Sequence, residues 1–231
     1  MKLSEAVRGV SGTLAADGEF SCIAFATEQE QSQFLTFLEK EKFLPALDNS
    51  KISCVLTTSA LAEKIPPHIK GVFLCDRPKA ALFEIHNRLA RHPDYVGASA
   101  ATVVGEGCSI SPLAAIDREN VVIGDRVTIE PFVVIKGRVI IGNDVTIRSG
   151  AVIGCKGFSF SKDAQGQNVS VEDTARIIIE DHVEIFEQVA ISTGIFPWEE
   201  TRIGENTKVD AQCHIGHGAH IGRNCLLAEG S

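Results

Sequence analysis

Residues 121–153 read VVIGDRVTIEPFVVIKGRVIIGNDVTIRSGAVI, and an isoleucine returns there at every sixth position, from Ile123 to Ile153. The same spacing resumes twice after an interruption, and it also precedes this stretch, with one extra residue before Ile123. The further positions are Val104, Ile110 and Ile116, then Ile179, Ile185 and Ile191, then Ile203, Val209, Ile215, Ile221 and Leu227. So strict a period indicates a stacked repeat architecture.

Each hexad predicts one short strand, because Val and Ile favour extended backbone. A small residue such as Gly124, Gly142 or Gly204 often follows the isoleucine and permits a tight bend. Three strands then close one coil of 18 residues, and successive coils lie about 4.8 Å apart. Residues 18 apart in sequence, such as Ile123 and Ile141, are expected to stack in columns that fill the interior of a prism.

Composition and charge narrow the classes of function that the chain can have. The chain has 231 residues, enough for one or two domains, and its net charge is −8 without a Lys/Arg run longer than two, which disfavours nucleic-acid binding. The seven cysteines form no CxxC pair and predict reduced thiols in the cytoplasm. The first residues lack the apolar core of a signal peptide, and no apolar run approaches the length of a membrane span.

Residues 1–97 lack the six-residue period and predict a small α/β domain ahead of the prism, which occupies residues 98–231. Residues 21–27, 52–57 and 71–75 are expected to be strands. Asp76 is expected to cap a helix that runs to about His92, with Pro78 in its first turn and Pro93 at its end. The joint between the domains is expected within residues 95–101.

Two insertions interrupt the prism. The first lies between Ile153 and Ile179, where residues 154–173 are too polar and glycine-rich for a coil wall and predict a projecting loop. The second lies between Ile191 and Ile203 and contains the apolar run Ile-Phe-Pro-Trp at 195–198. Such a loop must bury itself against another subunit, a ligand or its own wall, and the sequence leaves these alternatives open.

Three histidines, His214, His217 and His220, raise the question of a metal site. The hexad count places His214 and His220 at different corners and His217 on the wall between them, and the segment contains no carboxylate to support a metal ligand. We therefore expect no metal here.

The chain resembles the UDP-3-O-acylglucosamine N-acyltransferases, the N-acyltransferases of lipid A synthesis. The resemblance rests on DHVEI at 181–185, IGENTKVD at 203–210, IGH at 215–217 and the GFSF loop at 157–160. It extends to the first domain through LTFL at 35–38, SCVLT at 53–57 and the Asp76-Arg77-Pro78 helix start. It therefore covers essentially the whole chain.

The resemblance implies a mainly β fold, a left-handed parallel β-helix of hexapeptide repeats that forms a homotrimer. It implies transfer of a 3-hydroxyacyl chain from acyl carrier protein to the amine of a UDP-linked glucosamine. His217 aligns with the general base of the family, and Phe158 with its substrate-binding loop. Neither a cofactor nor a metal is implied, because the acyl thioester is itself a substrate.

Several positions depart from the family pattern. The uracil site of the family carries Phe, Asn and Tyr three residues apart, whereas this chain has Phe37, Lys40 and Phe43. Two rings can still stack on a base, but an ammonium cannot replace the paired donor and acceptor of an amide. Gly218 and the Ser-Thr-Gly run at 192–194 also differ from the family. These departures suggest a different amino sugar, for instance one destined for a surface polysaccharide.

The chain stops at Ser231, inside the hexad that begins at Leu227, and we expect the prism to be truncated there. Two alternatives to the N-acyltransferase follow. One is a catalytically silent nucleotide-sugar-binding or scaffold trimer, and the other is an amino-sugar N-acetyltransferase that uses acetyl-CoA. Docking of an acidic carrier protein would use local cations, for which the candidates are Lys156, Arg202, Lys208 and Arg223.

Overall fold

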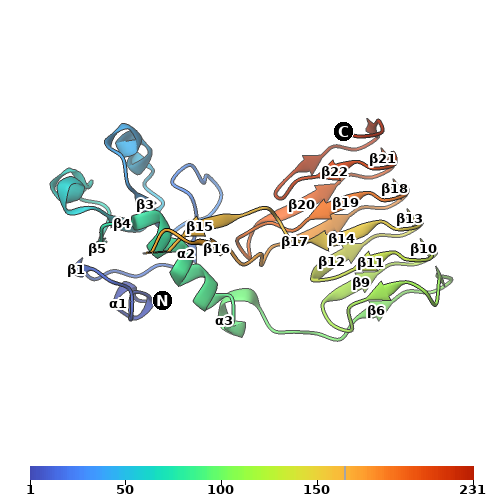
Figure 1. Cartoon of the computed structure of the whole chain (residues 1–231), viewed down its shortest axis with the longest axis horizontal. Coiled ribbons are helices and arrows are strands. Elements are labelled where there is room, and N and C mark those ends of the chain that lie inside the picture. Colours follow the sequence, from blue (N-terminus) through green and yellow to red (C-terminus); the bar gives the residue numbers. More distant parts are fainter. Residues whose placement is uncertain (164) are drawn as a thin grey trace. The chain divides into compact units, whose positions relative to one another are not determined.

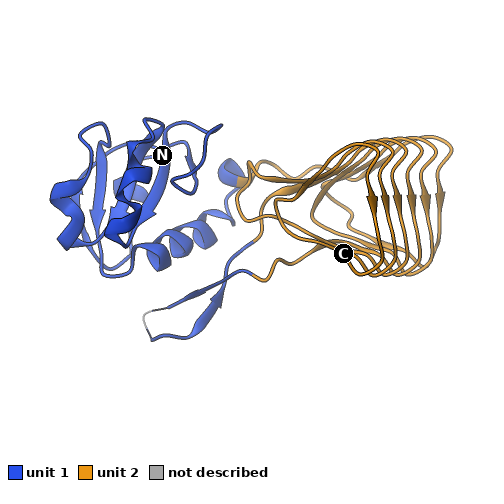
Figure 2. Ribbon diagram, turned by 90° about the horizontal axis from the view of Figure 1, so that it is seen from above, with its two compact units in different colours: residues 1–95, 159–172 blue, residues 96–158, 173–231 orange. Residues whose placement is uncertain are grey.

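The computed structural model describes residues 1–163 and 165–231, which form two compact units (Figure 2). Unit 1 contains residues 1–95 and 159–172, and unit 2 contains residues 96–158 and 173–231. The first insertion is therefore shared: its tip belongs with unit 1, although the sequence predicted a projecting loop of the prism.

Unit 1 is built on a five-stranded sheet in the order β1-β5-β4-β3-β2, in which β2 to β5 are parallel and β1 pairs antiparallel with β5. Its strands are β1 (Thr13–Ala16), β2 (Cys22–Ile23), β3 (Phe34–Leu38), β4 (Ile52–Thr57) and β5 (Gly71–Leu74). Its helical segments are α1 (Leu3–Ala6), η1 (Glu41–Asp48), η2 (Ser59–Lys64) and α2 (Pro78–Leu89), with α3 (Pro93–Val96) at the junction to unit 2. The antiparallel hairpin of β15 (Phe160–Lys162) and β16 (Asn168–Ser170) completes the unit.

The predicted strand at 52–57 and the helix that starts at Pro78 are present, but the predicted cap of that helix is wrong. The N-cap residue of α2 is Arg77, and its side chain makes no capping hydrogen bond. Instead Glu39, which follows β3, accepts the Lys79 N–H at 3.2 Å. A carboxylate from a neighbouring strand end thus satisfies a free N–H of the first turn.

Unit 2 is a prism with three walls, and each wall is a sheet of parallel strands (Figure 1). Wall 1 contains β7 (Ser109–Ile110), β10 (Thr128–Ile129), β13 (Thr146–Ile147), β18 (Glu184–Ile185), β21 (Lys208–Val209) and β24 (Leu226–Leu227). Wall 2 contains β8 (Ala115–Ile116), β11 (Val134–Ile135), β14 (Val152–Cys155), β19 (Ala190–Ser192) and β22 (His214–Ile215). Wall 3 contains β6 (Val103–Val104), β9 (Val121–Ile123), β12 (Arg138–Ile141), β17 (Arg176–Ile179), β20 (Glu200–Ile203) and β23 (His220–Ile221).

The predicted columns are confirmed by the strand register. Ile141 pairs with Ile123, and Ile221 pairs with Ile203, each 18 residues apart. Across the first insertion Ile141 pairs with Ile179, so the chain returns to the same register after it leaves the coil. The chain is therefore a mainly β protein, a parallel β-helix preceded by an α/β unit.

Each hexad places two side chains in the core. One is the predicted isoleucine, and the other is the residue two positions before it, because alternate residues of a strand face the same side. This second position is mostly valine on all three walls, as at Val121, Val127, Val133 and Val139, which are fully buried. Two threonines, Thr201 on wall 3 and Thr207 at the start of wall 1, occupy the same hexad position with no exposed surface.

The corners between walls share a local conformation. The second residue of the turn has a positive φ in most coils, between 55° and 77°, whether it is glycine or another residue. Its N–H donates to a carbonyl of the preceding coil, as Gln212 does to Glu187 at 3.0 Å and Asn224 to Glu205 at 2.9 Å. Main-chain bonds therefore tie the corners together as well as the walls.

None of the helices in the described part of the chain combines the length and apolar character needed to cross a membrane. All seven cysteines lie in that part and are free thiols.

Candidate active site at one edge of the prism

Both insertions leave the prism at the same edge, where wall 2 turns into wall 3. The first occupies residues 156–175 between β14 and β17, and the second occupies residues 193–199 between β19 and β20. In the next coil the same edge carries the turn 216–219 between β22 and β23, and His217 lies in that turn. The two insertions, residues 156–175 and 193–199, are called the first and second excursions below. Both excursions and His217 therefore lie along a single edge of the prism.

The chain turns out of wall 2 at Gly154, near the end of β14. Its φ is +86°, and a Cβ at this position would lie 1.9 Å from the Lys136 carbonyl oxygen. Only glycine fits such a place. The register of β14 against β19 shifts between Ile153 and Cys155, which directs the chain out of the wall.

The second excursion buries its own apolar residues. Ile195 is 6% exposed and Phe196 is not exposed at all, and the Phe196 ring stacks on Trp198 with 5.9 Å between centroids. The Glu199 carboxylate accepts the N–H groups of Ile195 and Phe196 at 2.9 and 3.1 Å. Of the alternatives left open by the sequence, burial within the chain itself is therefore what the structure shows.

The start of the first excursion lies against the His217 ring. A Cβ on Gly157 would lie 3.6 Å from His217 Cδ2, 3.4 Å from the Thr193 carbonyl oxygen and 3.5 Å from Asp173 Oδ1. The Gly157 N–H donates to the other oxygen of Asp173 at 2.8 Å. Both limbs of the first excursion and the start of the second thus meet beside His217.

The His217 side chain is exposed, and within the described residues its ring makes no intramolecular hydrogen bond. An exposed imidazole of this kind is open to a substrate, and the Gly157 loop beside it leaves space because glycine has no side chain. The hexad count was wrong about its setting: His217 lies at an edge, whereas His214 and His220 lie on strands. The count took the residue before each isoleucine as a corner, but that residue is part of the strand.

The two strand histidines have partners. His214 Nε2 lies 2.9 Å from the Ser192 hydroxyl, which in turn lies 3.3 Å from Cys155 Sγ. His220 Nε2 lies 3.2 Å from the Glu200 carbonyl oxygen. No cluster of three metal-ligating side chains is found among residues 1–163 and 165–231.

The remaining predicted site residues divide between the units. Phe158 follows Gly157 in unit 2, and its side chain is 94% exposed. Phe37, Lys40 and Phe43 belong to unit 1: Phe37 is half-buried on β3, and Lys40 and Phe43 are exposed at the start of η1. The binding roles of all four stay predictions.

Aromatic contacts distinguish the two rings of unit 1. The Phe37 ring packs edge-on against Phe25, with 6.5 Å between centroids. Phe43 is 54% exposed, and the Lys42 ammonium lies 4.8 Å from its ring centroid. A planar base can reach the Phe43 face directly, whereas Phe37 already has an aromatic neighbour.

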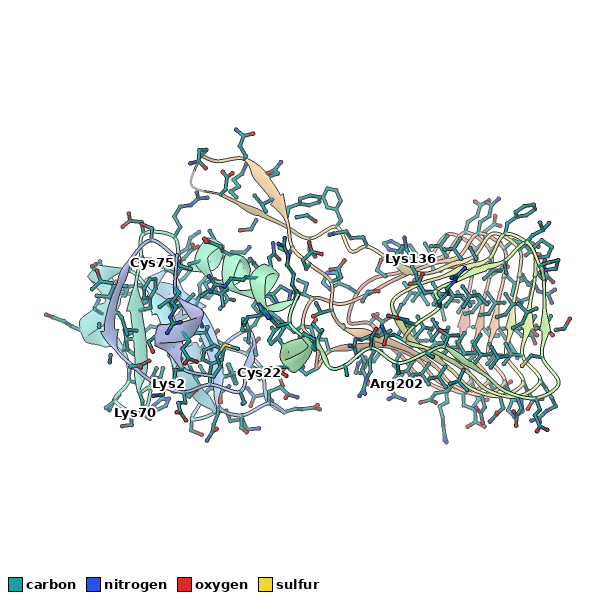
Figure 3. The ribbon with its side chains drawn as sticks, turned by 90° about the horizontal axis from the view of Figure 1, so that it is seen from below. Lys2, Cys22, Lys70, Cys75, Lys136 and Arg202 are labelled. Carbon is teal, nitrogen blue, oxygen red and sulfur yellow. The ribbon has the colours of Figure 1, made fainter. Side chains whose placement is uncertain are left out.

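Unit 1 also contains a cavity of about 470 Å³ along α2, between the N-terminal segment and the hairpin. Cys75, labelled in Figure 3, lines it, and burial raises the pKa of that thiol to about 11. None of the predicted binding residues lines this cavity.

The candidate docking cations Arg202, Lys208 and Arg223 are in ion pairs. Arg202, at the surface of the prism in Figure 3, bonds Glu180 at 2.5 Å and Glu200 at 2.7 Å. Lys208 pairs with Glu184 at 2.9 Å and Arg223 with Glu205 at 3.6 Å. Their charges are therefore largely balanced within the prism.

Sequence reasoning missed the Thr201 hydroxyl, which accepts the Gly218 N–H in the His217 turn at 3.0 Å. Thr201 stands where most coils have valine, two positions before the wall isoleucine. A hydroxyl at a mostly valine position was the available signal, because a buried polar atom requires a partner.

Comparison with known proteins agrees with this architecture. The family model described as bacterial transferase hexapeptide (six repeats) matches residues 120–155 and 200–231. The coils and this match show that the chain contains hexapeptide repeats.

Two curated relatives are similar to most of this chain. A UDP-3-O-acylglucosamine N-acyltransferase from Bradyrhizobium sp. is 40% identical over 239 residues, which cover 88% of this chain and 64% of the relative. One from Coxiella burnetii is 28% identical over 251 residues, which cover 98% of this chain and 72% of that relative. The chain is homologous to the UDP-3-O-acylglucosamine N-acyltransferases, and it spans about two thirds of their length.

Among solved structures, a UDP-N-acetylglucosamine acyltransferase from Bacteroides fragilis is 34% identical, with a TM-score of 0.46. The match covers 55% of this chain and 46% of that one.

Proposed function

We propose that this protein is an N-acyltransferase that moves a (3-hydroxy)acyl chain from acyl carrier protein to the amine of a UDP-linked glucosamine derivative, as in lipid A synthesis. His217 is its general base. The observation that carries the proposal is the position of His217: an exposed imidazole at the edge where both excursions leave, beside Gly157 and the Thr193 carbonyl. The names of the homologous proteins support the substrate class.

The proposed chemistry needs one proton acceptor. The amine nitrogen attacks the thioester carbonyl carbon, and the neutral His217 imidazole takes the proton that the nitrogen loses. The tetrahedral intermediate then collapses: the C–N bond remains, the C–S bond breaks, and the protonated imidazole returns its proton to the leaving sulfur. A backbone N–H stabilises the developing oxyanion. The thioester is a substrate, and the reaction as proposed uses neither a metal nor a cofactor.

The nucleotide is proposed to bind through Phe37, Lys40 and Phe43, and the acceptor or acyl group through Phe158. The exposed Phe43 face suits stacking on a base, Phe37 is half-buried, and Lys40 can donate to a carbonyl or phosphate oxygen. Lys40 stands where the resembling family has an amide, and an ammonium cannot supply the paired donor and acceptor of that amide. This substitution is the observation that favours an amino sugar of a surface polysaccharide as the second candidate.

A donor and acceptor panel tests the proposal. Thioester consumption is measured with 3-hydroxyacyl carrier protein and with acetyl-CoA, each against UDP- and dTDP-linked amino sugars, and the amide product is identified by mass spectrometry. We expect turnover with a carrier-protein donor and a UDP-amino sugar. Turnover with acetyl-CoA but not with the carrier-protein thioester would mean that acetyl-CoA is the donor. Nucleotide binding without turnover across the panel would indicate the silent scaffold instead.

The homotrimer and the cytoplasmic location are proposals of the same kind. Light scattering tests the first, since a trimer has three times the chain mass of 24.8 kDa.

A further inference from the structure

The turn that carries His217 lacks the main-chain bond that holds other corners of the prism. At those corners the second turn residue donates its N–H to a carbonyl of the preceding coil, as Gln212 does to Glu187. At the edge between walls 2 and 3 the preceding coil has departed at Thr193 as the second excursion. The corresponding N–H, that of Gly218, therefore needs a different acceptor.

A side chain supplies it. The Gly218 N–H donates to Thr201 Oγ1 at 3.0 Å, and the Thr201 hydroxyl donates to the Ser192 carbonyl oxygen at 2.9 Å. Thr201 has no exposed surface, so its hydroxyl makes both bonds out of contact with bulk water. The hydroxyl thus joins the end of β19 to the turn that carries the imidazole.

The turn depends on this bond because its second residue is glycine. Gly218 has a φ of +68° and no side chain within the turn to limit its conformation. A loosened Gly218 would let the adjacent His217 move, and displacement of a reacting group by about 1 Å costs up to about 100-fold in rate.

We propose that Thr201 is a positioning residue, which holds the His217–Gly218 turn in the geometry that proton transfer requires. The expected loss of kcat rests on the proposed function. The structural role of Thr201 in holding the turn does not. Thr201 itself lies in the core column and touches no substrate.

The prism contains a matched control. Thr207 occupies the same buried hexad position on wall 1, donates to the Gly222 carbonyl oxygen at 2.8 Å and accepts the Cys225 N–H at 3.1 Å. Its turn joins walls 3 and 1 and carries no residue of the candidate site. Thr→Val at either residue gives the side chain that other coils use at this hexad position, so packing is preserved while the hydroxyl is lost.

The kinetic test compares Thr201→Val, Thr201→Ser and Thr207→Val. We expect Thr201→Val to lower kcat about 10-fold with little change in the KM for the amino sugar. Thr201→Ser should recover most of the loss, because it restores the hydroxyl. Thr207→Val should lose thermal stability to a similar degree and keep the wild-type kcat. Equal kcat values for the two valine variants would overturn the proposal.

Amide hydrogen exchange gives a readout that does not need activity. The Gly218 amide should exchange at least about 10-fold faster in Thr201→Val than in the wild type or Thr201→Ser. If the wild-type protein proves inactive with every donor and acceptor, the proposed function fails while this measurement still decides the role of Thr201. Unchanged exchange at Gly218 would refute it.

Discussion

The Ser192 hydroxyl and His214 Nε2 lie 2.9 Å apart, across two neighbouring strands of wall 2. Ser192 is 3% exposed and also contacts Cys155, whereas the other end of the His214 ring reaches the surface. The carbonyl of the same serine accepts the Thr201 hydroxyl. Ser192 therefore fixes one imidazole through its side chain and supports the turn of the other through its main chain.

Ser192→Ala should release the His214 ring without moving the wall. The ¹⁵N signal of His214 Nε2 should shift because its hydrogen-bond partner is gone, and the protein should lose about 1 kcal/mol of unfolding free energy in urea. His220 is the internal control, since its Nε2 faces the Glu200 carbonyl and not a serine. Unshifted His214 signals would mean that the hydrogen bond is absent in solution.

His217→Ala should reduce turnover at least about 10²-fold if the imidazole is the general base. The side chain is exposed, so the unfolding free energy should change by less than about 0.5 kcal/mol. His182→Asn is the control: His182 lies at another corner with a φ of +59°, which asparagine tolerates. Steady-state kinetics on both variants check this, and equal activity in both would remove His217 from the mechanism.

Acid should weaken the prism through the carboxylates beside Arg202. The Glu205 N–H and the Arg202 guanidinium lower the pKa of Glu180, and Arg202 is the main cause of the lowered pKa of Glu200. A carboxyl whose pKa is lower in the folded state stabilises the protein fully above its unfolded pKa, about 4.3 for glutamate, and loses that contribution as the pH falls below it.

Chemical unfolding between pH 6 and pH 3 measures this loss. Arg202→Gln should lower stability at pH 6 and make the acid limb shallower, because less pairing remains to be lost. Arg223→Gln is the control, since its pair with Glu205 is long and well exposed. Parallel acid limbs in the wild type and Arg202→Gln would contradict the assignment.

Two adjacent residues of β12 test the isoleucine columns. Ile141 is 1% exposed and stacks between Ile123 and Ile179, whereas Ile140 is 40% exposed on the same strand. Ile141→Ala should cost about 2–5 kcal/mol of unfolding free energy, because it leaves a cavity in the core. Ile140→Ala should cost less than about 1 kcal/mol. Similar losses in denaturant titrations would mean that the inward and outward faces are misassigned.

Much of the prism was predictable because its signal is periodic. The isoleucine columns and both interruptions followed from spacing alone, and the strand at 52–57 followed from β propensity. The second, mostly valine column was not counted, although strand alternation implies it. Both interruptions follow a wall-2 isoleucine, Ile153 or Ile191, so their shared edge was also contained in the sequence.

The site was less predictable because its contacts join segments that no local pattern relates. The family resemblance pointed to His217, but the hexad count placed it on a wall. The contacts of Gly157 with His217 and of Thr201 with Gly218 depend on where the excursions leave. The Glu39 cap of α2 likewise comes from a distant strand end.

Because both excursions leave the coil at one edge and return in register, the pairing of the wall strands is the same before and after each of them. Ile141 still meets Ile179, and Ile185 still meets Val209, whatever lies between. The prism is in this sense a constant scaffold that carries two exchangeable segments. Grafting the excursions of one hexapeptide-repeat transferase onto another offers a direct route to new acceptor preferences on an unchanged scaffold.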